Sequence, residues 1–456
     1  MDILIMAGQL ILGLSILVIL HEFGHFLAAR AFGIKVEKFY LFFDAWNFSL
    51  FKFNFKGVEY GVGWLPLGGY VKIAGMIDES MDTDQLAGPP QPWEFRSKPA
   101  WQRLIVMLGG IIVNIIVGIF IFWVLTIKYG ETYTPNANIK YGIVPGVIGQ
   151  KMGLKAGDKI TEVNGKPIER FEDLISSKVL LDKTVLTVQR GTQTLEIKVP
   201  STILNDLSDY GIEEFISRMP RTTFMVDSVV ANSNAQKAGL QKGDSILAVN
   251  GTAIHFYDEF QNRLKEFKSK KANLTVKRKS DTLALITDVN KDGMLGFADG
   301  RFGIKVKTDL PQEKTVNYGF FGSLPIGAVK AWGMFTDNAK GIGKIFTGQV
   351  KARKAISSPI GIAVMFGSHV DWIRFWSLVG FLSMVLALTN LLPIPGLDGG
   401  HTLFLLIEMI KGKPLSDKFL ERAQIVGFVL LISLMVFAFG NDIVKQFTKK
   451  PTIERR

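Results

Sequence analysis

The chain of 456 residues is 48% hydrophobic and carries a formal net charge of +12, which indicates membrane spans with basic loops facing anionic lipid. The basic residues form no stripe with interleaved aromatic residues, so we expect the lipid bilayer as a partner and no nucleic acid. Because the chain contains no cysteine, disulfides and thiolate zinc sites are excluded, and any transition metal must be bound by His, Asp or Glu.

Residues 1–34 begin with an uncharged run, Ile3–Leu20, that is long enough to cross a bilayer. The run lacks a cationic start and a small-residue cleavage site, so we predict a retained first transmembrane helix and not a signal peptide. At its end lies the sequence His21-Glu22-Phe23-Gly24-His25. On a helix this H-E-x-x-H pattern places two imidazoles on one face, where they can bind one metal ion.

The motif assigns different chemistry to its three polar side chains. His21 and His25 are the expected metal ligands, and Glu22 is the expected catalytic residue, a general base acting on a metal-bound water. Their place at the end of a span predicts hydrolysis inside the membrane or at its edge. The alternative is a His pair that serves only helix packing.

Residues 35–103 are predicted to form a cytoplasmic loop with a β-element. Phe51, Phe53 and Phe55 alternate with polar residues, which is the period of a strand with one apolar face. The glycine-rich run 61–72 that follows predicts a hairpin or a small sheet. Because the segment is strongly apolar, we expect the element to re-enter the membrane beside the metal site, with a soluble sheet on the cytoplasmic face as the alternative.

Three further segments satisfy the criterion for a membrane span: residues 104–127, 375–397 and 423–444. Lys and Arg are concentrated in the short loops 35–103 and 398–422, which places both loops in the cytoplasm and the large central region outside. The basic tail, 445–456, favours the opposite orientation. We follow the first loop, because its signal is the strongest and the earliest.

The central region contains an internal repeat. Gly157-Asp158 recurs as Gly243-Asp244, and Val163-Asn164-Gly165 recurs as Val249-Asn250-Gly251, at one constant offset of 86 residues (157 to 243). We therefore predict two tandem domains, 128–212 and 213–305. Each copy is predicted to run helix, Gly-Asp turn, strand, Asn-Gly hairpin, strand.

The order of elements in each copy resembles a circularly permuted PDZ domain. PDZ domains bind peptides by adding a strand to a sheet edge, often at a free terminus, so peptide or substrate termini are possible partners. The alternative is a bulky pair that binds no specific peptide and acts as a sieve. Residues 306–374 are predicted to be a linker that contains an amphipathic helix at the membrane interface.

A catalytic zinc typically takes three protein ligands and a water, so a third ligand is needed. Asp398 is the best candidate, because an unpaired carboxylate at the end of a span is costly unless it is bound. His401 is the alternative ligand. Pro393 and Pro395 break the helix just before Asp398, and such irregular backbone at membrane depth usually lines a cavity.

Two asparagines in the spans are candidate substrate-binding residues. Asn390 can donate a hydrogen bond to the scissile carbonyl or its oxyanion. Asn114 can do the same, or it can bond two helices together. Two other functions fit parts of the sequence: a non-proteolytic PDZ-containing scaffold or chaperone, which would need no metal, and a zinc transporter. The second and fourth spans offer no metal-binding residues, which argues against the transporter.

With these motifs the chain resembles the site-2 protease family of intramembrane zinc metalloproteases, in its bacterial regulator-of-sigma-E type. The matching segments cover essentially the whole chain: His21–His25, Gly68–Lys72, Phe95–Arg103, Gly110 with Asn114, the two repeats, and Asn390–His401. The expected fold class is a multi-pass α-helical membrane protein with four transmembrane helices, a membrane-associated β-element and two tandem PDZ-like α+β domains.

The resemblance implies Zn2+ as cofactor and single-pass membrane proteins as substrates, such as anti-sigma factors already trimmed outside and remnant signal peptides. It also implies the bacterial inner membrane, an active site reached from the cytoplasmic side, and both termini outside with the PDZ-like pair. The pair would exclude untrimmed substrates. The strand edge at Gly69, Tyr70 and Val71 could hold an unwound substrate by strand addition.

Overall fold

The structure is a computed structural model that describes residues 2–66, 68–76, 88–296, 303–356 and 358–447. The chain divides into two compact units, which are described separately. The first, the membrane unit, combines Met1–Glu131 with Val316–Lys449, and the second, the repeat unit, is built on Thr132–Thr315.

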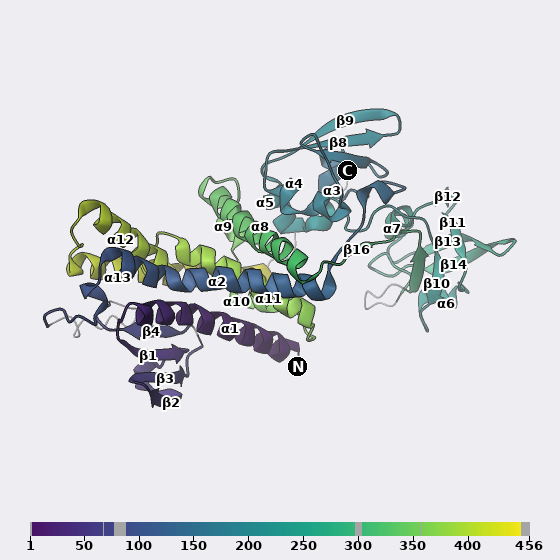
Figure 1. Cartoon of the computed structure of the whole chain (residues 1–456). Coiled ribbons are helices and arrows are strands. Elements are labelled where there is room, and N and C mark those ends of the chain that lie inside the picture. Colours follow the sequence, from purple (N-terminus) through teal and green to yellow (C-terminus); the bar gives the residue numbers. More distant parts are fainter. Residues whose placement is uncertain (1, 67, 77–87, 297–302, 357, 448–456) are drawn as a thin grey trace. The chain divides into compact units, whose positions relative to one another are not determined.

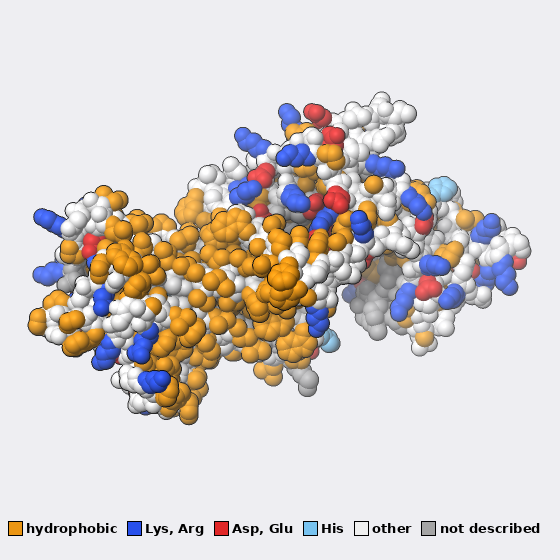
Figure 2. Space-filling model, viewed as in Figure 1, with side chains coloured by type: hydrophobic (Ala, Val, Ile, Leu, Met, Phe, Trp, Pro, Cys, Tyr) orange, Lys and Arg blue, Asp and Glu red, His pale blue; other side chains and the backbone are white. Residues whose placement is uncertain are grey.

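Four helices among the described residues are long and apolar enough to cross a membrane. They are α1 (Asp2–Ala31), α2 (Ala100–Tyr129), α11 (Trp372–Leu391) and α13 (Asp417–Phe447), the last with its span in Lys418–Val444. Apolar side chains cover much of the helical surface seen in Figure 2, as expected where lipid replaces water. These helices agree in number and order with the four spans that hydropathy predicted.

Helix α2 is the central helix of the membrane unit. It packs against α1, α11, α8 (Phe320–Phe346) and α12 (Asp398–Lys411), as Figure 1 shows for α1 and α8. The short helices α9 (Ala352–Ala355) and α10 (Pro359–Phe366) precede α11. Helix α8 is the segment for which a place at the membrane interface was expected. Its buried Ala331 packs with Phe122 of α2 and Met384 of α11, so one face of α8 is covered by spanning helices.

Two spanning helices end elsewhere than expected, for local reasons. Helix α1 continues through the metal motif to Ala31 and stops where Gly33 adopts a φ of 66°, a left-handed conformation that terminates helices. Helix α11 ends at Leu391, so the expected span 375–397 is too long. Pro393 and Pro395 have no N–H with which to continue the helix, and residues 392–397 connect α11 to α12 without helical structure.

A four-stranded sheet follows α1. Its strands are β1 (Val36–Leu41), β2 (Ser49–Phe55), β3 (Val58–Gly63) and β4 (Tyr70–Ile73), in the order β2-β3-β1-β4. Strand β1 runs parallel to β3 and antiparallel to β4. The run 61–72 is therefore not a hairpin, because β1 lies between its two strands, and the alternative of a small sheet holds. Buried Val36, Val71 and Ile73 pack with residues of α1, α2 and α12.

The predicted repeat forms two sheets of identical strand order. The first is β7 (Lys166–Pro167), β6 (Lys159–Val163), β8 (Thr184–Arg190), β9 (Gln193–Val199), and the second is β12 (Thr252–Ala253), β11 (Ser245–Val249), β13 (Lys271–Arg278), β14 (Asp281–Asp288). Asn164 and Asn250 have φ of 53° and 47°, and each precedes a glycine of positive φ. Two consecutive positive φ angles define the tight hairpin turn that Asn-Gly favours.

The remaining elements of the repeat unit surround these sheets. They are the helices α3 (Val147–Lys151), α4 (Ser177–Leu180), α5 (Ile203–Tyr210), α6 (Asn234–Lys237) and α7 (Tyr257–Lys265), and the strand pairs β10 (Phe224–Val229) with β15 (Ile304–Thr308) and β5 (Glu131–Tyr133) with β16 (Lys314–Val316). Each repeat has its own core. Phe215 and Ile216 belong to the first core, and Ile216 pairs with Pro145. The boundary between the repeats therefore follows Ile216, later than the expected 212/213.

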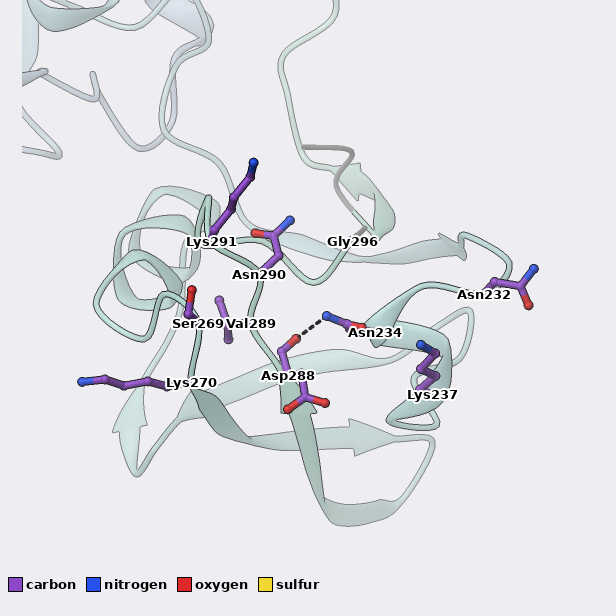
Figure 3. Close-up of a pocket in the computed structure, with 10 residues that line it drawn as sticks. All are labelled: Asn232, Asn234, Lys237, Ser269, Lys270, Asp288, Val289, Asn290, Lys291 and Gly296. Carbon is purple, nitrogen blue, oxygen red and sulfur yellow. Dashed lines mark hydrogen bonds between the residues drawn. The ribbon is translucent and has the colours of Figure 1, made fainter. Parts of the chain in front are cut away.

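A polar pocket of about 430 Å³ lies in the second repeat, between α6 and the end of β14 (Figure 3). Asn234 donates a hydrogen bond across it to the backbone oxygen of Asp288 at 2.9 Å. Lys237, Lys270 and Lys291 also line the pocket, which gives it a basic rim.

Both repeats contain the same buried ion pair. Asp158 of the first and Asp244 of the second are buried, and each accepts two hydrogen bonds from an arginine, Arg190 or Arg278, at 2.7–2.8 Å. Burial alone would raise the pKa of Asp244, but the hydrogen bonds from Arg278 and from the backbone of Gln241 outweigh it and hold the pKa below its usual range. The Gly-Asp turn of the sequence repeat is thus fixed by an arginine two strands later.

We predict that Asp244→Ala destabilises the second repeat by about 2 kcal/mol, because it removes the charge-assisted hydrogen bonds that the buried carboxylate accepts. The loss of stability should be complete at pH 7. The pKa of Asp244 is lower in the folded state than in the unfolded state, so its carboxylate stabilises the fold above the unfolded-state pKa, and this contribution is lost as the pH falls through the folded-state pKa. The difference between the variant and the wild type should therefore disappear in acid. Hydrogen exchange of the backbone amides in 222–296 and 303–308, followed by mass spectrometry, measures it. The control is Asp227→Ala, whose partner Lys242 is 80% exposed, with an expected effect below about 1 kcal/mol. Equal effects of the two substitutions would contradict the prediction.

Candidate metal centre

Three side chains from two helices converge near the end of α1. Nε2 of His21 and Nε2 of His25 are 3.2 Å apart, and Oδ2 of Asp398 lies 3.1 Å from the first and 3.3 Å from the second. The three side chains are between 9% and 13% exposed. Among the residues that the structure describes, this is the one group of three His, Asp or Glu residues with the arrangement of metal ligands.

The spacing of these three atoms fits zinc. Ligand atoms about 2.0–2.1 Å from a tetrahedral zinc are separated from one another by about 3.3 Å. The three observed separations of 3.1–3.3 Å agree with this edge length. Oδ2 of Asp398 is buried and accepts no hydrogen bond within the described part of the chain, as expected of an oxygen that faces a cation. Two imidazole nitrogens and one carboxylate oxygen are also the donor set of catalytic zinc sites.

The first turn of α12 positions Asp398. The chain leaves α11, folds back through Pro393 and Pro395, and enters α12 at Asp398. Gly399 lies against the backbone of Leu391 and Leu392, and Gly400 against that of Ile394 and Pro395, so closely that a Cβ at either glycine would collide. The two glycines therefore permit the fold-back that brings the carboxylate to α1.

Further along α12, Glu408 forms an ion pair with Arg103 of α2. The guanidinium also donates to the backbone oxygen of Lys98 at 2.9 Å. The carboxylate of Glu408 is engaged in this pair and does not belong to the metal cluster. His401, the alternative ligand, does not belong to the metal cluster either, and its ring lies edge-on to Phe404.

Glu22 lies between the metal cluster and the sheet. Its electrostatic neighbours are His21, His25 and Asp398, and the backbone N–H of Val71 donates a hydrogen bond to it. A Cβ on Gly69 would lie 2.7 Å from the Val18 side chain and 3.5 Å from Cγ of Glu22, so the absence of a side chain lets the chain approach α1 here. Strand β4 is an edge strand of its sheet and begins beside the predicted general base.

The side chain of Tyr70 serves the sheet. Its hydroxyl donates to Asp44 at 2.7 Å, and its ring stacks on Tyr40. Burial alone would raise the pKa of Asp44, but hydrogen bonds from Tyr70 and Lys38 outweigh it and hold the pKa below its usual range. Burial, with the Glu59 carboxylate that its hydroxyl contacts, raises the pKa of Tyr40 to about 12. The side chain of Tyr70 is therefore engaged within the sheet.

The two asparagines contact opposite nitrogens of one imidazole. Nδ2 of Asn390 lies 3.1 Å from Nε2 of His21, which is the nitrogen that faces Asp398. Nδ2 of Asn114 lies 3.1 Å from Nδ1 of His21, on the far side of the ring. Asn114 is fully buried. The geometry therefore places Asn390 beside the metal cluster and Asn114 behind it.

Sequence reasoning missed two contributions of α2. The backbone oxygen of Val106 lies 2.8 Å from Nδ1 of His25. A backbone oxygen leaves no signature in the sequence, because every residue has one. Gly110 lies against the rings of His21 and His25, and the pair Gly109-Gly110 inside an apolar helix was a signal that could have been followed.

Comparison with known proteins supplies the family. The model of "Peptidase family M50" matches residues 9–434. The "Regulator of sigma-E protease RseP" of Escherichia coli (strain K12) is 31% identical over 458 residues, which cover 95% of this chain and 97% of that protein. The "Regulator of sigma E protease" of Haemophilus influenzae is 30% identical, with 96% and 98% covered. A "Putative zinc metalloprotease" of Xylella fastidiosa (strain Temecula1) is 30% identical, with 97% and 99% covered.

These matches agree with the four membrane-spanning helices and favour a protease over a non-proteolytic scaffold. The match extends over nearly the whole chain and includes His21 and His25 as well as Asp398. The chain belongs to peptidase family M50 and is a zinc-dependent intramembrane metalloprotease of the site-2 type.

Proposed function

We propose that His21, His25 and Asp398 hold the catalytic zinc and that Glu22 carries the proton in the hydrolysis of peptide bonds in membrane segments. The observation that carries this proposal is the convergence of the three ligand atoms, 3.1–3.3 Å from one another, next to Glu22. When bound, zinc polarises the scissile carbonyl and makes a water nucleophilic at neutral pH. Glu22 then accepts a proton from the attacking water and returns it to the leaving amine. Asn390 donates from its amide to the carbonyl oxygen.

The substrate helix must be unwound before it is cut, because its carbonyls are held in hydrogen bonds to N–H groups four residues later. We propose that β4, from Gly69 to Val71, holds the unwound segment by strand addition. Three observations support this: β4 is an edge strand, it begins beside Glu22, and the close approach at Gly69 leaves no side chain between strand and helix.

We further propose that the sheet is membrane-associated. Phe51, Phe53 and Phe55 of β2 are 61%, 50% and 56% exposed, and Trp46 beside them is 86% exposed. Aromatic side chains exposed in this number suit the boundary between headgroups and acyl chains. Lys52 and Lys56 alternate with them and suit anionic headgroups.

The two repeats are proposed to be PDZ-like domains that lie outside the cytoplasm and exclude bulky, untrimmed substrates. Their duplicated strand order and their Asn-Gly hairpins support the PDZ-like assignment. Capture of a substrate terminus is the alternative role. The names of the relatives support substrates of the anti-sigma type, and remnant signal peptides are a second class that the same chemistry accepts. The setting is the bacterial inner membrane, with the active site open to the cytoplasm.

Glu22→Gln should abolish cleavage of a tagged single-pass substrate, with a loss of at least about 100-fold, because the amide cannot accept the proton. Zinc content should stay at the wild-type level, since Glu22 is not one of the proposed ligands. Cleavage is measured in detergent with purified enzyme, and zinc by elemental analysis. A variant that cuts at the wild-type rate would contradict the mechanism.

Asp398→Ala should lower the zinc bound per chain, because it removes one of three protein ligands. Elemental analysis after dialysis against a weak chelator provides the measurement. His401→Ala serves as the matched control on the same helix and should retain zinc. The ligand assignment is wrong if His401→Ala loses zinc and Asp398→Ala retains it.

Removal of residues 134–313 should let the enzyme cut an untrimmed substrate as fast as a trimmed one. The design is feasible because β5 and β16 pair where the repeat unit begins and ends, with the hydroxyls of Thr132 and Thr315 2.9 Å apart, so a short Gly-Ser linker can join them. The assay compares initial rates on both substrates for the whole chain and the shortened chain. Loss of cleavage of the trimmed substrate would indicate peptide capture and not exclusion.

A further inference from the structure

We infer that helix α2 orients both zinc-binding imidazoles, and that Asn114 is a positioning residue whose amide oxygen accepts a hydrogen bond from Nδ1–H of His21. This inference rests on the proposed metal centre and deepens it. It changes the role expected of Asn114, from a donor to the substrate to an acceptor for a metal ligand. It also adds Val106 and Gly110, to which no role had been assigned.

The three α2 residues lie on one face of the helix. Val106, Gly110 and Asn114 are spaced four residues apart, and so are the histidines of α1. Val106 contacts His25, Asn114 contacts His21, and Gly110 lies between them against both rings. Each imidazole is therefore supported from behind by the same helix, while its Nε2 faces Asp398.

The contact to Val106 decides which nitrogen of His25 carries hydrogen. A backbone carbonyl can only accept, so at 2.8 Å the Nδ1 of His25 must donate. In a neutral imidazole this leaves the lone pair on Nε2, the atom that lies 3.3 Å from Asp398. Metal-binding histidines generally show this arrangement, with the second ring nitrogen bonded to a backbone oxygen or a carboxylate.

His21 needs the same arrangement, and Asn114 supplies it. Nε2 of His21 lies in the metal cluster, so its Nδ1 carries the hydrogen and requires an acceptor. As placed, Asn114 presents Nδ2 to this nitrogen, while its own Oδ1 is buried without a hydrogen-bond partner in the described part of the chain. The two ends of an amide have nearly the same shape. Rotating the Asn114 amide by half a turn makes Oδ1 the acceptor for His21 and places Nδ2 where the oxygen had no partner.

Asn114 is well held for this task. Its side chain is fully buried, and its backbone oxygen accepts a hydrogen bond from Ser383 of α11 at 2.7 Å. The Asn114 amide is buried on the Nδ1 side of the His21 ring. A substrate carbonyl must approach on the Nε2 side. Asn390 already occupies that side.

Gly110 sets how closely the two rings can approach α2. A Cβ at this position would lie 2.5 Å from Cε1 of His21 and 2.5 Å from Nε2 of His25. Atoms that close must move, so even an alanine displaces both rings. The neighbouring residue Gly109 meets Gly24 of α1 backbone to backbone, so the two helices are already in close contact here.

The test exploits the difference between an acceptor and a donor. Asn114→Asp keeps an acceptor oxygen and loses the amide donor, whereas Asn114→Leu loses both. We use the whole chain in detergent and measure zinc retention against a graded chelator, together with the visible absorption of the Co2+-substituted protein. Asn114→Leu should weaken metal binding about 10–100-fold and alter the Co2+ bands, and Asn114→Asp should stay within about threefold of wild type. Gly110→Ala should lower retention as Asn114→Leu does.

Matched controls separate positioning from folding. Ser383→Ala removes the hydrogen bond to the backbone of Asn114 and leaves the His21 contact, and Gly8→Ala adds a methyl to α1 where nothing lies within 4 Å. Both should bind zinc as wild type does. If Asn114→Leu does not fold, as judged by tryptophan fluorescence on heating, Asn114→Ala replaces it.

Two results would overturn the inference: wild-type metal affinity in Asn114→Leu, or equal loss in Asn114→Asp and Asn114→Leu. Asp398→Ala is measured in parallel and reports on the metal centre itself. Unchanged zinc in Asp398→Ala would contradict the proposed ligands, and the comparison among the Asn114 variants would remain a separate result.

Discussion

Helices α1 and α2 meet backbone to backbone at Gly24 and Gly109, and the proposed metal centre depends on this contact. A side chain at either position would force the helices apart. Because the helices approach so closely, His25, which is next to Gly24, and His21, three residues before that glycine, lie against α2, where a carbonyl oxygen and a buried amide can hold them. Small residues at helix interfaces are a common means of close packing in membranes. Here the close packing also brings the two proposed histidine ligands against α2.

The third proposed ligand, Asp398, begins helix α12 directly after a segment that is not helical. Residues 392–397 fold back between α11 and α12, and the glycines after Asp398 allow the first turn of α12 to sit on that irregular backbone. Irregular backbone is tolerated at membrane depth only where protein or a cavity surrounds it. The same segment carries the carboxylate into the cluster and follows directly on Asn390. Ligand and predicted substrate donor therefore come from the two ends of one short break in the helices.

The sheet that follows α1 brings an edge strand to the same place. Strand β4 packs through Val71 and Ile73 onto the helices, and the hydroxyl of Tyr70 is hydrogen-bonded to Asp44. These contacts hold the strand rigidly. Its outer edge has no strand partner among the described residues. A rigid edge beside Glu22 suits a substrate that must be extended to be cut. The repeat unit has a separate core for each copy. Its proposed role is selection of substrates, which is separable from the chemistry.

The sequence by itself determined the four spans, the H-E-x-x-H motif, Asp398 as the leading candidate ligand, and the duplicated domain with its Asn-Gly turns. These features are local: hydropathy, helical spacing and turn chemistry are properties of short segments, and the offset of 86 residues is visible without a fold. Only the tertiary structure decided that β1 lies between β3 and β4 and that Val106 bonds His25. It likewise decided that Asn114 lies behind His21, on the side away from Asp398. Strand order depends on contacts between distant segments. Every residue has a backbone oxygen, so the sequence does not show which one bonds a histidine. The side of the histidine on which an asparagine lies depends on how the helices pack.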